Sequence, residues 1–117
     1  MGKLTTHILD TAQGRPAGGV SIDLYRCTAA GRCALGHALT NADGRCASPL
    51  LADSAFVSGV YELDFQIGDY FARQNLGGAA PRFLDVVTLR FGVSDAAADY
   101  HVPLLVSPFG YSTYRGS

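Results

Sequence analysis

Residues 61–67 read Tyr-Glu-Leu-Asp-Phe-Gln-Ile, a strict alternation of apolar and polar side chains. Because successive side chains of a β-strand point to opposite faces, this alternation predicts a strand with one buried face and one solvated face. Residues 20–24, Val-Ser-Ile-Asp-Leu, repeat the pattern. Each buried face needs a second apolar surface to cover it, so both segments favour a fold of packed β-sheets.

Further strands and turns extend this interpretation over the whole chain. Strands are expected at Leu4–Asp10, His37–Thr40, Phe83–Val93, Tyr100–Val106 and Tyr111–Arg115, with a short edge piece near Ser54–Val57. Turn sequences rich in Gly, Pro, Asn or Asp separate them, at 13–16, 30–32, 41–44 and 107–110. A short helix is expected from Gly68 to Leu76, with Gly77 as its left-handed cap. The pattern predicts an all-β protein, a two-sheet antiparallel sandwich with Greek-key-like connections, formed by residues 1–117 as one domain.

Composition and charge argue against several classes of partner. The 117 residues include 9 Lys and Arg against 10 Asp and Glu, for a formal net charge of −1. The basic residues are scattered singly, so no basic stripe is available to neutralise nucleic-acid phosphates. No apolar run approaches the ~20 residues that span a bilayer, and the chain does not open on a hydrophobic signal segment. We therefore expect neither a nucleic acid nor a membrane as partner, and a cytoplasmic location.

The three cysteines, Cys27, Cys33 and Cys46, are an odd number. An odd count fits reduced intracellular thiols better than a disulfide framework. A hairpin could bring Cys27 and Cys33 together, but their spacing is not that of a zinc knuckle. We interpret all three as structural.

Two of the three histidines are expected on the outward faces of strands. In the strand 100–106 the even-numbered residues form one continuous apolar face, so His101 points to the other side. In the strand 4–10, the side chains of Leu4 and Ile8 share a face, and His7 lies opposite them. An outward histidine is most often simply solvated, and for His37 we keep that interpretation.

Pro103 lies two residues after His101 on the same outward face, within an almost unbroken apolar run from 102 to 106. This composition indicates a face that is covered, as at a subunit interface. Burial there would favour the neutral imidazole, which a general base requires near neutral pH.

Arg45 and the chain terminus offer further polar groups. Arg45 follows the turn Asn41-Ala42-Asp43-Gly44, which would present its guanidinium just past a strand end. An ordinary arginine in a turn, without a functional role, has the same sequence pattern. Tyr114, Arg115 and Ser117 could supply donors and acceptors to a planar polar ligand, with Arg115 offering a bidentate fork. Spacing alone leaves open whether the terminus is a site or a surface.

The chain resembles the transthyretin-like 5-hydroxyisourate hydrolases along its whole length. The matching segments are Leu4–Ala12 with Gly14 and Pro16-Ala17, Thr40-Asn41 with Asp43-Gly44-Arg45, His101–Leu105 through Ser107-Pro108, and Gly110–Ser117. The terminal Tyr-Arg-Gly-Ser is the most specific of them, because it separates the hydrolases from the hormone-carrying transthyretins. The resemblance implies two four-stranded sheets with one short helix, and a homotetramer with long clefts at the dimer–dimer interface.

The resemblance also implies an activity: hydrolysis of 5-hydroxyisourate, the product of urate oxidation, to 2-oxo-4-hydroxy-4-carboxy-5-ureidoimidazoline, without a cofactor. The matching catalytic positions are His7, Arg45 and His101. Opening a cyclic amide needs a water molecule that is deprotonated as it attacks, and a neutral imidazole suits that step. Either histidine is a candidate for the base, with Arg45 stabilising the oxyanion and with Tyr114, Arg115 and Ser117 holding the planar ring.

Three other interpretations are weighed beside the hydrolase. A transthyretin-type carrier would bind a small aromatic ligand in the tetramer channel, but such a channel requires an apolar lining, and imidazoles with a guanidinium suit a polar heterocycle. An adhesion sandwich would need no convergent set of residues. A metal site of His7, His101 and their symmetry mates lacks carboxylate or thiolate partners at recognisable spacing, so we expect none.

Overall fold

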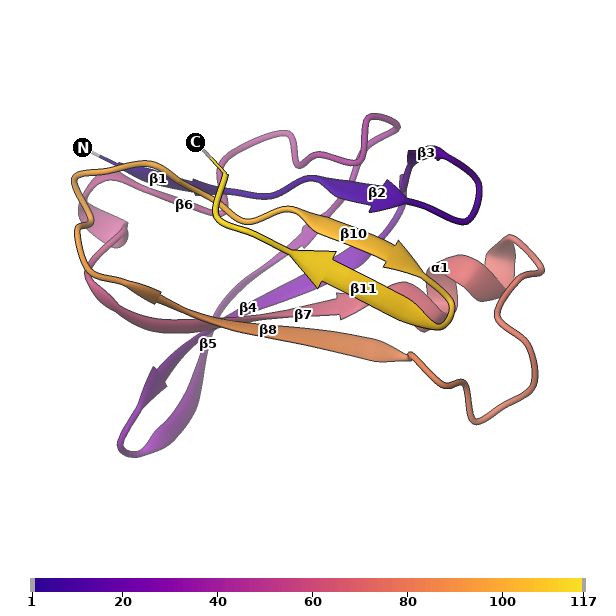
Figure 1. Ribbon diagram of the computed structural model, residues 1–117. Coiled ribbons are helices and arrows are strands. Elements are labelled where there is room, and N and C mark those ends of the chain that lie inside the picture. Colours follow the sequence, from indigo (N-terminus) through magenta and orange to yellow (C-terminus); the bar gives the residue numbers. More distant parts are fainter. Residues whose placement is uncertain (1, 117) are drawn as a thin grey trace.

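The computed structural model describes residues 2–116 as a β-sandwich of two layers with a short helix at one end (Figure 1). The strands are β1 (Lys3–Thr5), β2 (Ile8–Asp10), β3 (Arg15–Pro16), β4 (Ser21–Thr28), β5 (Gly31–Leu39), β6 (Leu51–Ala52), β7 (Gly59–Gln66), β8 (Val86–Val93), β9 (Tyr100–His101), β10 (Leu104–Ser107) and β11 (Gly110–Thr113). The helices are the 3-10 helix η1 (Asp53–Ala55) and α1 (Ile67–Arg73). The all-β sandwich expected from the sequence is confirmed.

The lower layer of Figure 1 is one antiparallel sheet in the order β5-β4-β7-β8. The alternation that predicts β7 is borne out, because Tyr61, Leu63 and Phe65 are fully buried on one face. On β4 the inward residues Ile22 and Leu24 are buried in the same way. These inward side chains form the lower half of the core.

The upper layer consists of two short sheets, in the orders β6-β1-β9 and β11-β10-β2-β3. The expected strands 4–10 and 100–106 are each broken once, so that β1 and β2 pair in parallel with β9 and β10. At the break the hydroxyl of Thr6 donates to the carbonyl of Val102 over 2.7 Å. Pro103 has no N–H that could donate a backbone hydrogen bond at this point. The Thr6 hydroxyl adds a side-chain hydrogen bond there, and the two short sheets remain one continuous layer.

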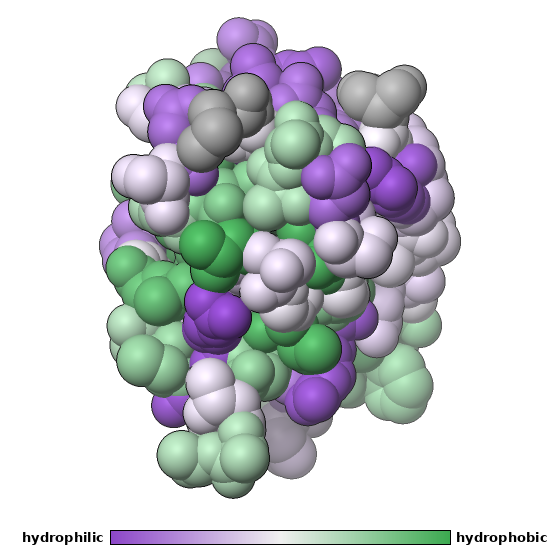
Figure 2. All heavy atoms as spheres, turned by 90° about the vertical axis from the view of Figure 1, so that its left-hand side faces the viewer, coloured by the Kyte–Doolittle hydropathy of each residue, from purple (hydrophilic) through white to green (hydrophobic). Residues whose placement is uncertain are grey.

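The chain crosses between the layers after β3, β5, β6 and β8, which gives the expected Greek-key-like connections. Leu4, Ile8 and Leu104 of the upper layer are fully buried against the lower layer. Figure 2 looks on the end of the sandwich where β1 begins, and shows hydrophobic residues in its middle with hydrophilic residues gathered toward its upper part. Burial of the apolar side chains between the two layers makes the main favourable contribution to the stability of the fold.

The hairpin of β4 and β5 is longer than expected. The sequence predicts a strand only at 37–40, whereas β5 pairs with β4 from Leu39 to Gly31. This hairpin extends beyond the sandwich (Figure 1), and almost every residue of β5 is exposed. Because β5 has solvent on both faces, its sequence does not need to alternate between apolar and polar residues. The alternation that predicts a strand is therefore missing there.

Other expected boundaries are also wrong. The expected edge strand near 54–57 is instead the 3-10 helix η1, preceded by β6. Helix α1 spans Ile67–Arg73 and ends before Leu76, and the left-handed residue after it is Asn75, at φ 59°, rather than Gly77. Asparagine tolerates this conformation because its short polar side chain bonds locally.

Candidate active site

His7 and His101 lie on the outward face of the upper layer, as the alternation predicts. Both side chains are partly buried, whereas their neighbours Thr6, Ile8 and Val102 are buried. The parallel pairing of β1 with β9 sets Thr5 directly beside His101, although the two residues are 96 positions apart in sequence. Strand pairing therefore brings both ends of the chain to one surface.

Arg45 reaches the same surface through the turn at 41–44. Its backbone forms an isolated antiparallel bridge with His7, and the amide of Ile8 donates to the carbonyl of Gly44 over 2.8 Å. Gly44 has φ 73°, and a Cβ atom there would collide with the carbonyl oxygen of Ile8. Only glycine tolerates both the positive φ and the close approach to Ile8. Glycine at position 44 therefore allows the turn to hold Arg45 beside His7.

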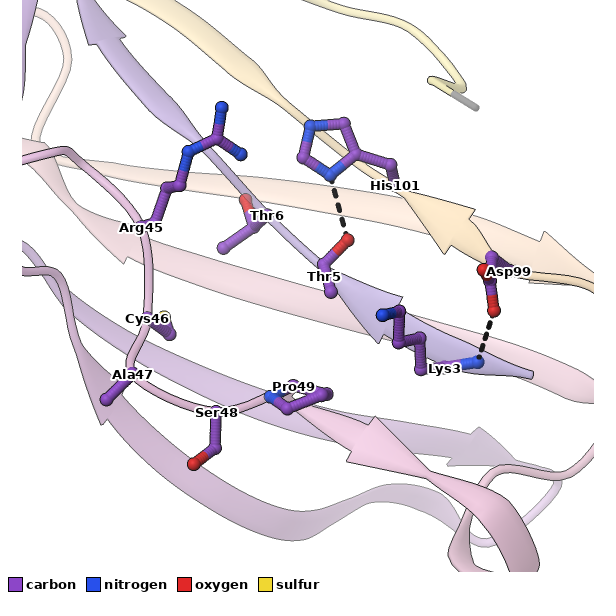
Figure 3. A pocket seen from close by; sticks show the side chains of 10 residues that line it. All are labelled: Lys3, Thr5, Thr6, Arg45, Cys46, Ala47, Ser48, Pro49, Asp99 and His101. Carbon is purple, nitrogen blue, oxygen red and sulfur yellow. Dashed lines mark hydrogen bonds between the residues drawn. The ribbon is translucent and has the colours of Figure 1, made fainter. Parts of the chain in front are cut away.

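A cavity of about 500 Å³ opens between these residues (Figure 3). Its walls include Thr5, Arg45 and His101, together with Asp99 and the loop 46–49. His7 does not line this cavity but adjoins it through its bridge to Arg45. The cavity is therefore a polar cleft with a guanidinium and an imidazole on its walls.

Hydrogen bonds orient both imidazole rings. Nε2 of His7 lies 2.8 Å from the carbonyl oxygen of Asp43. A carbonyl only accepts, so this nitrogen carries the proton and Nδ1 of neutral His7 keeps its lone pair. Nδ1 of His101 lies 2.9 Å from the hydroxyl of Thr5, which leaves its Nε2 turned toward Arg45 (Figure 3).

The pKa of His101 is lowered, chiefly because burial disfavours the charged ring and further because the positive charge of Arg45, and that of His7 in its protonated form, lie nearby. A lowered pKa keeps the imidazole neutral around pH 7. In the tautomer whose Nδ1 donates to the Thr5 hydroxyl, Nε2 keeps its lone pair and can accept a proton from water while the guanidinium of Arg45 stabilises developing negative charge.

Residues 115 and 116, near the end of the chain, pack against the strand that carries His101. The guanidinium of Arg115 stacks 3.9 Å from the ring centre of Tyr100 and donates to the carbonyl of Asp99 over 3.4 Å. The amide of Gly116 donates to the carbonyl of His101 over 2.7 Å, and a Cβ atom at 116 would lie 2.7 Å from the ring carbon Cδ2. Glycine at 116 therefore allows the tail to lie directly against the imidazole.

The expected binding residues of the tail are only partly near the cleft. Tyr114 is 60% exposed and, with Arg115, lines a second, open cavity of about 690 Å³ that His101 also borders. Arg115 does not line the first cavity, since its guanidinium lies on the ring of Tyr100. Ser117 lies outside the described residues.

Sequence reasoning did not single out Thr5 or Asp99. Thr5 has one available signal, because strand alternation sets it on the same face as His7. Its pairing with His101 depends on a long-range parallel register that no local pattern reveals. Asp99 accepts the backbone amide of Lys3 over 3.2 Å, another contact between distant segments.

Within residues 2–116 no group of three or more His, Cys, Asp and Glu side chains is arranged to hold a metal ion. The cysteines Cys27, Cys33 and Cys46 are all free. In the β4–β5 hairpin Cys27 pairs with Arg32, and Cys33 pairs with Arg26, so the two thiols point to opposite faces. The hairpin therefore forms as the sequence allows, but it does not bring the two thiols together.

Comparison with known proteins gives a consistent group of relatives. The model of the HIUase/Transthyretin family matches residues 4–116. A protein of Ralstonia nicotianae named 5-hydroxyisourate hydrolase is 56% identical over 117 residues, which is 100% of both chains. No helix within the described part of the chain is long and apolar enough to cross a membrane.

Two solved structures are similar to the chain in fold. The crystal structure of an (S)-allantoin synthase superposes with a TM-score of 0.93 at 44% identity; the match covers 99% of this chain but 44% of the synthase. Sea bream transthyretin in complex with thyroxine superposes with a TM-score of 0.86 at 29% identity, covering 97% of this chain and 94% of the transthyretin.

Proposed function

The chain belongs to the HIUase/Transthyretin family, and on that premise we propose that it hydrolyses 5-hydroxyisourate to 2-oxo-4-hydroxy-4-carboxy-5-ureidoimidazoline, a step of urate degradation. The observation that carries the proposal is the cleft in which neutral His101 faces Arg45. This pair offers a proton acceptor and a fixed cation to one reacting carbonyl.

In the proposed reaction, Nε2 of His101 takes a proton from water as the water oxygen attacks the cyclic amide carbonyl. Negative charge then develops on the carbonyl oxygen, and the guanidinium of Arg45 stabilises it. When the carbon–nitrogen bond breaks, the protonated imidazole returns its proton to the leaving nitrogen. The ring opens to a carboxylic acid, which releases its proton to solvent and becomes the carboxylate, and His101 ends neutral, as it began.

His7 has a supporting role in this scheme. Its Nε2 proton is held by the carbonyl of Asp43, and its backbone is paired with Arg45. Its backbone bridge therefore fixes the position of Arg45, and in its protonated form His7 adds positive charge that lowers the pKa of His101. We assign the base to His101 because its ring borders both cavities.

We propose that the active form is a homotetramer whose sites lie at the dimer–dimer interface. The cleft and the tail cavity are both open on the outward face of the upper layer. A second protomer over this face would exclude water and strengthen the electrostatic interactions inside. Free thiols suit a reducing compartment, so we propose a cytoplasmic enzyme. Size-exclusion chromatography with light scattering tests the tetramer.

The transthyretin-type carrier is the weaker alternative. An apolar aromatic ligand in the cleft would leave the guanidinium of Arg45 and the imidazole of His101 without polar partners, and buried polar groups left unpaired disfavour such a ligand. A polar heterocycle with several carbonyl and N–H groups can satisfy both side chains.

The direct test follows the decay of 5-hydroxyisourate, freshly made with urate oxidase, by ultraviolet absorbance and circular dichroism. We expect catalytic amounts of the protein to accelerate the decay through an optically active intermediate. An unchanged decay in the presence of the folded tetramer would contradict the proposal and favour the carrier.

Thr5 should act as a positioning residue for His101. The change Thr5→Val keeps the branched shape but removes the hydroxyl that contacts Nδ1 at 2.9 Å. We expect kcat to fall about 10–100-fold with KM nearly unchanged, because a misplaced base costs rate rather than substrate affinity. The change Thr5→Ser restores the hydroxyl and should recover most of the activity; equal loss in both variants would exclude this role.

The contribution that Arg45 adds to the effect of burial on the His101 pKa can be measured by NMR titration of the imidazole ring protons. We expect a pKa below the ordinary histidine value of about 6.5. In Arg45→Gln the pKa should rise, because the positive charge that disfavours the protonated ring is gone. The rate of the parent enzyme should fall only as the pH drops through the lowered pKa, where the base becomes protonated. A pKa unmoved by Arg45→Gln would refute the coupling.

A further inference from the structure

A second cluster of polar side chains lies on the outer face of the lower layer, on the opposite side of the sandwich from the cleft. On β4, Ser21 and Asp23 alternate with the buried residues Ile22 and Leu24, so both point outward. The pairing of β4 with β5 sets His37 directly opposite Asp23. The imidazole of His37 thus stands between two outward side chains of the neighbouring strand.

The hydrogen bonds of this cluster have a definite order. Nδ1 of His37 lies 2.8 Å from Oδ1 of Asp23, and Nε2 lies 3.3 Å from the hydroxyl oxygen of Ser21. A carboxylate only accepts, so Nδ1 carries the proton. Nε2 of the neutral ring then holds the lone pair, and the Ser21 hydroxyl donates to it.

A hydroxyl bonded to one imidazole nitrogen and a carboxylate bonded to the other is the arrangement that activates serine nucleophiles, and it is recognised by geometry rather than by fold. We propose that Ser21, His37 and Asp23 form a second site, at which Ser21 accepts an acyl group from aryl esters. None of these residues lines the cleft of the proposed hydrolase.

The step balances without a cofactor. The oxygen of Ser21 bonds to the ester carbonyl carbon while its proton passes to Nε2 of His37. The bond from that carbon to the aryl oxygen breaks, and the phenolate leaves with the proton from His37. The products are acyl-Ser21 and a phenol. Water can repeat the sequence and release the carboxylic acid, with Asp23 holding the ring in the required tautomer throughout.

The surroundings define the class of substrate. Leu39 pairs with Ser21 across the strands and is 60% exposed, so it offers apolar contact to an aryl ring beside the nucleophile. The side chains of His37 and Asp23 are 58% and 35% exposed, so an ester reaches them directly from solvent. An open site gives little oxyanion stabilisation, which restricts it to esters with good leaving groups such as nitrophenolate.

The neighbouring charges leave Asp23 available to His37. Asp64 pairs directly with Asp23 on the adjacent strand, but its carboxylate is engaged by Arg32 over 2.6 Å and by the hydroxyl of Thr88 over 2.7 Å. Repulsion between the two carboxylates is therefore offset by a bound cation.

The test incubates the full-length protein with p-nitrophenyl acetate and maps acetyl groups by peptide mass spectrometry over time. We expect Ser21 to be acetylated faster than any other serine. The change His37→Asn should slow this acetylation by about 100-fold, the loss typical of removing a general base. The change Asp23→Asn should slow it by a smaller factor, and Ser21→Ala should remove the modification.

Ser58 provides a matched control, because it is an exposed serine outside the cluster. Ser58→Ala should leave the acetylation of Ser21 unchanged, and melting temperatures should show that all variants remain folded. Acetylation of Ser21 at the parent rate in His37→Asn, or labelling confined to amines and other hydroxyls, would overturn the proposal. The outcome does not depend on hydrolysis of 5-hydroxyisourate, so the two proposals fail independently.

Discussion

Replacing His101 with asparagine should lower kcat/KM for 5-hydroxyisourate by about 10²–10⁴-fold, the range associated with loss of a general base. Asparagine retains a polar group that can meet the Thr5 hydroxyl, which contacts Nδ1 of the histidine at 2.9 Å. It provides no nitrogen that takes a proton near pH 7. The loss should appear mainly in kcat, because the base acts in the transition state rather than in binding.

The same substitution at His7 separates the two histidines. His7→Asn should cause a smaller loss, because the Nε2 proton of His7 is already committed to the Asp43 carbonyl and its ring does not line the first cavity. Stopped-flow absorbance with urate oxidase as the generating enzyme gives both constants. If His7→Asn proves the more damaging variant while both proteins remain folded, the roles of the two residues must be exchanged.

Strand alternation predicted which side chains point inward and which outward. His7 and His101 were expected opposite the buried residues Leu4 and Val102, and the structure has them so. This works because the side-chain period of a strand is set by its backbone and needs no knowledge of the partner strand. The same argument is silent about which strands pair and in which direction.

Contacts between distant segments were therefore beyond sequence reasoning. The Thr5–His101 bond depends on a parallel register across 96 positions, and the His7–Arg45 bridge depends on a turn docking against a strand break. Arg115 was expected to hold the substrate, but its guanidinium stacks on Tyr100. An arginine offers both a planar stacking surface and a hydrogen-bonding fork, and composition does not indicate which one is used.

The largest loss of stability is expected from Asp10→Ala. Asp10 is 1% exposed, and its carboxylate accepts four hydrogen bonds, from the amides of Ala12 and Gln13, the side chain of Gln13 and the hydroxyl of Tyr70. Tyr70 belongs to α1, so this carboxylate joins the helix to the end of β2. Removing it leaves the buried hydroxyl of Tyr70 and three part-buried donors without their acceptor, which should cost about 3–4 kcal/mol of unfolding free energy.

Thermal and urea unfolding at one fixed protomer concentration measure this loss, with an expected fall in Tm of roughly 10–15 °C. Tyr70→Phe alone should cost about 1–2 kcal/mol, because it removes one donor and leaves the other bonds intact. In the Asp10→Ala background the same change should cost little or even stabilise, since it deletes a buried hydroxyl that has lost its partner. Additive losses in the double variant would show that the Asp10–Tyr70 bond does not join helix to strand.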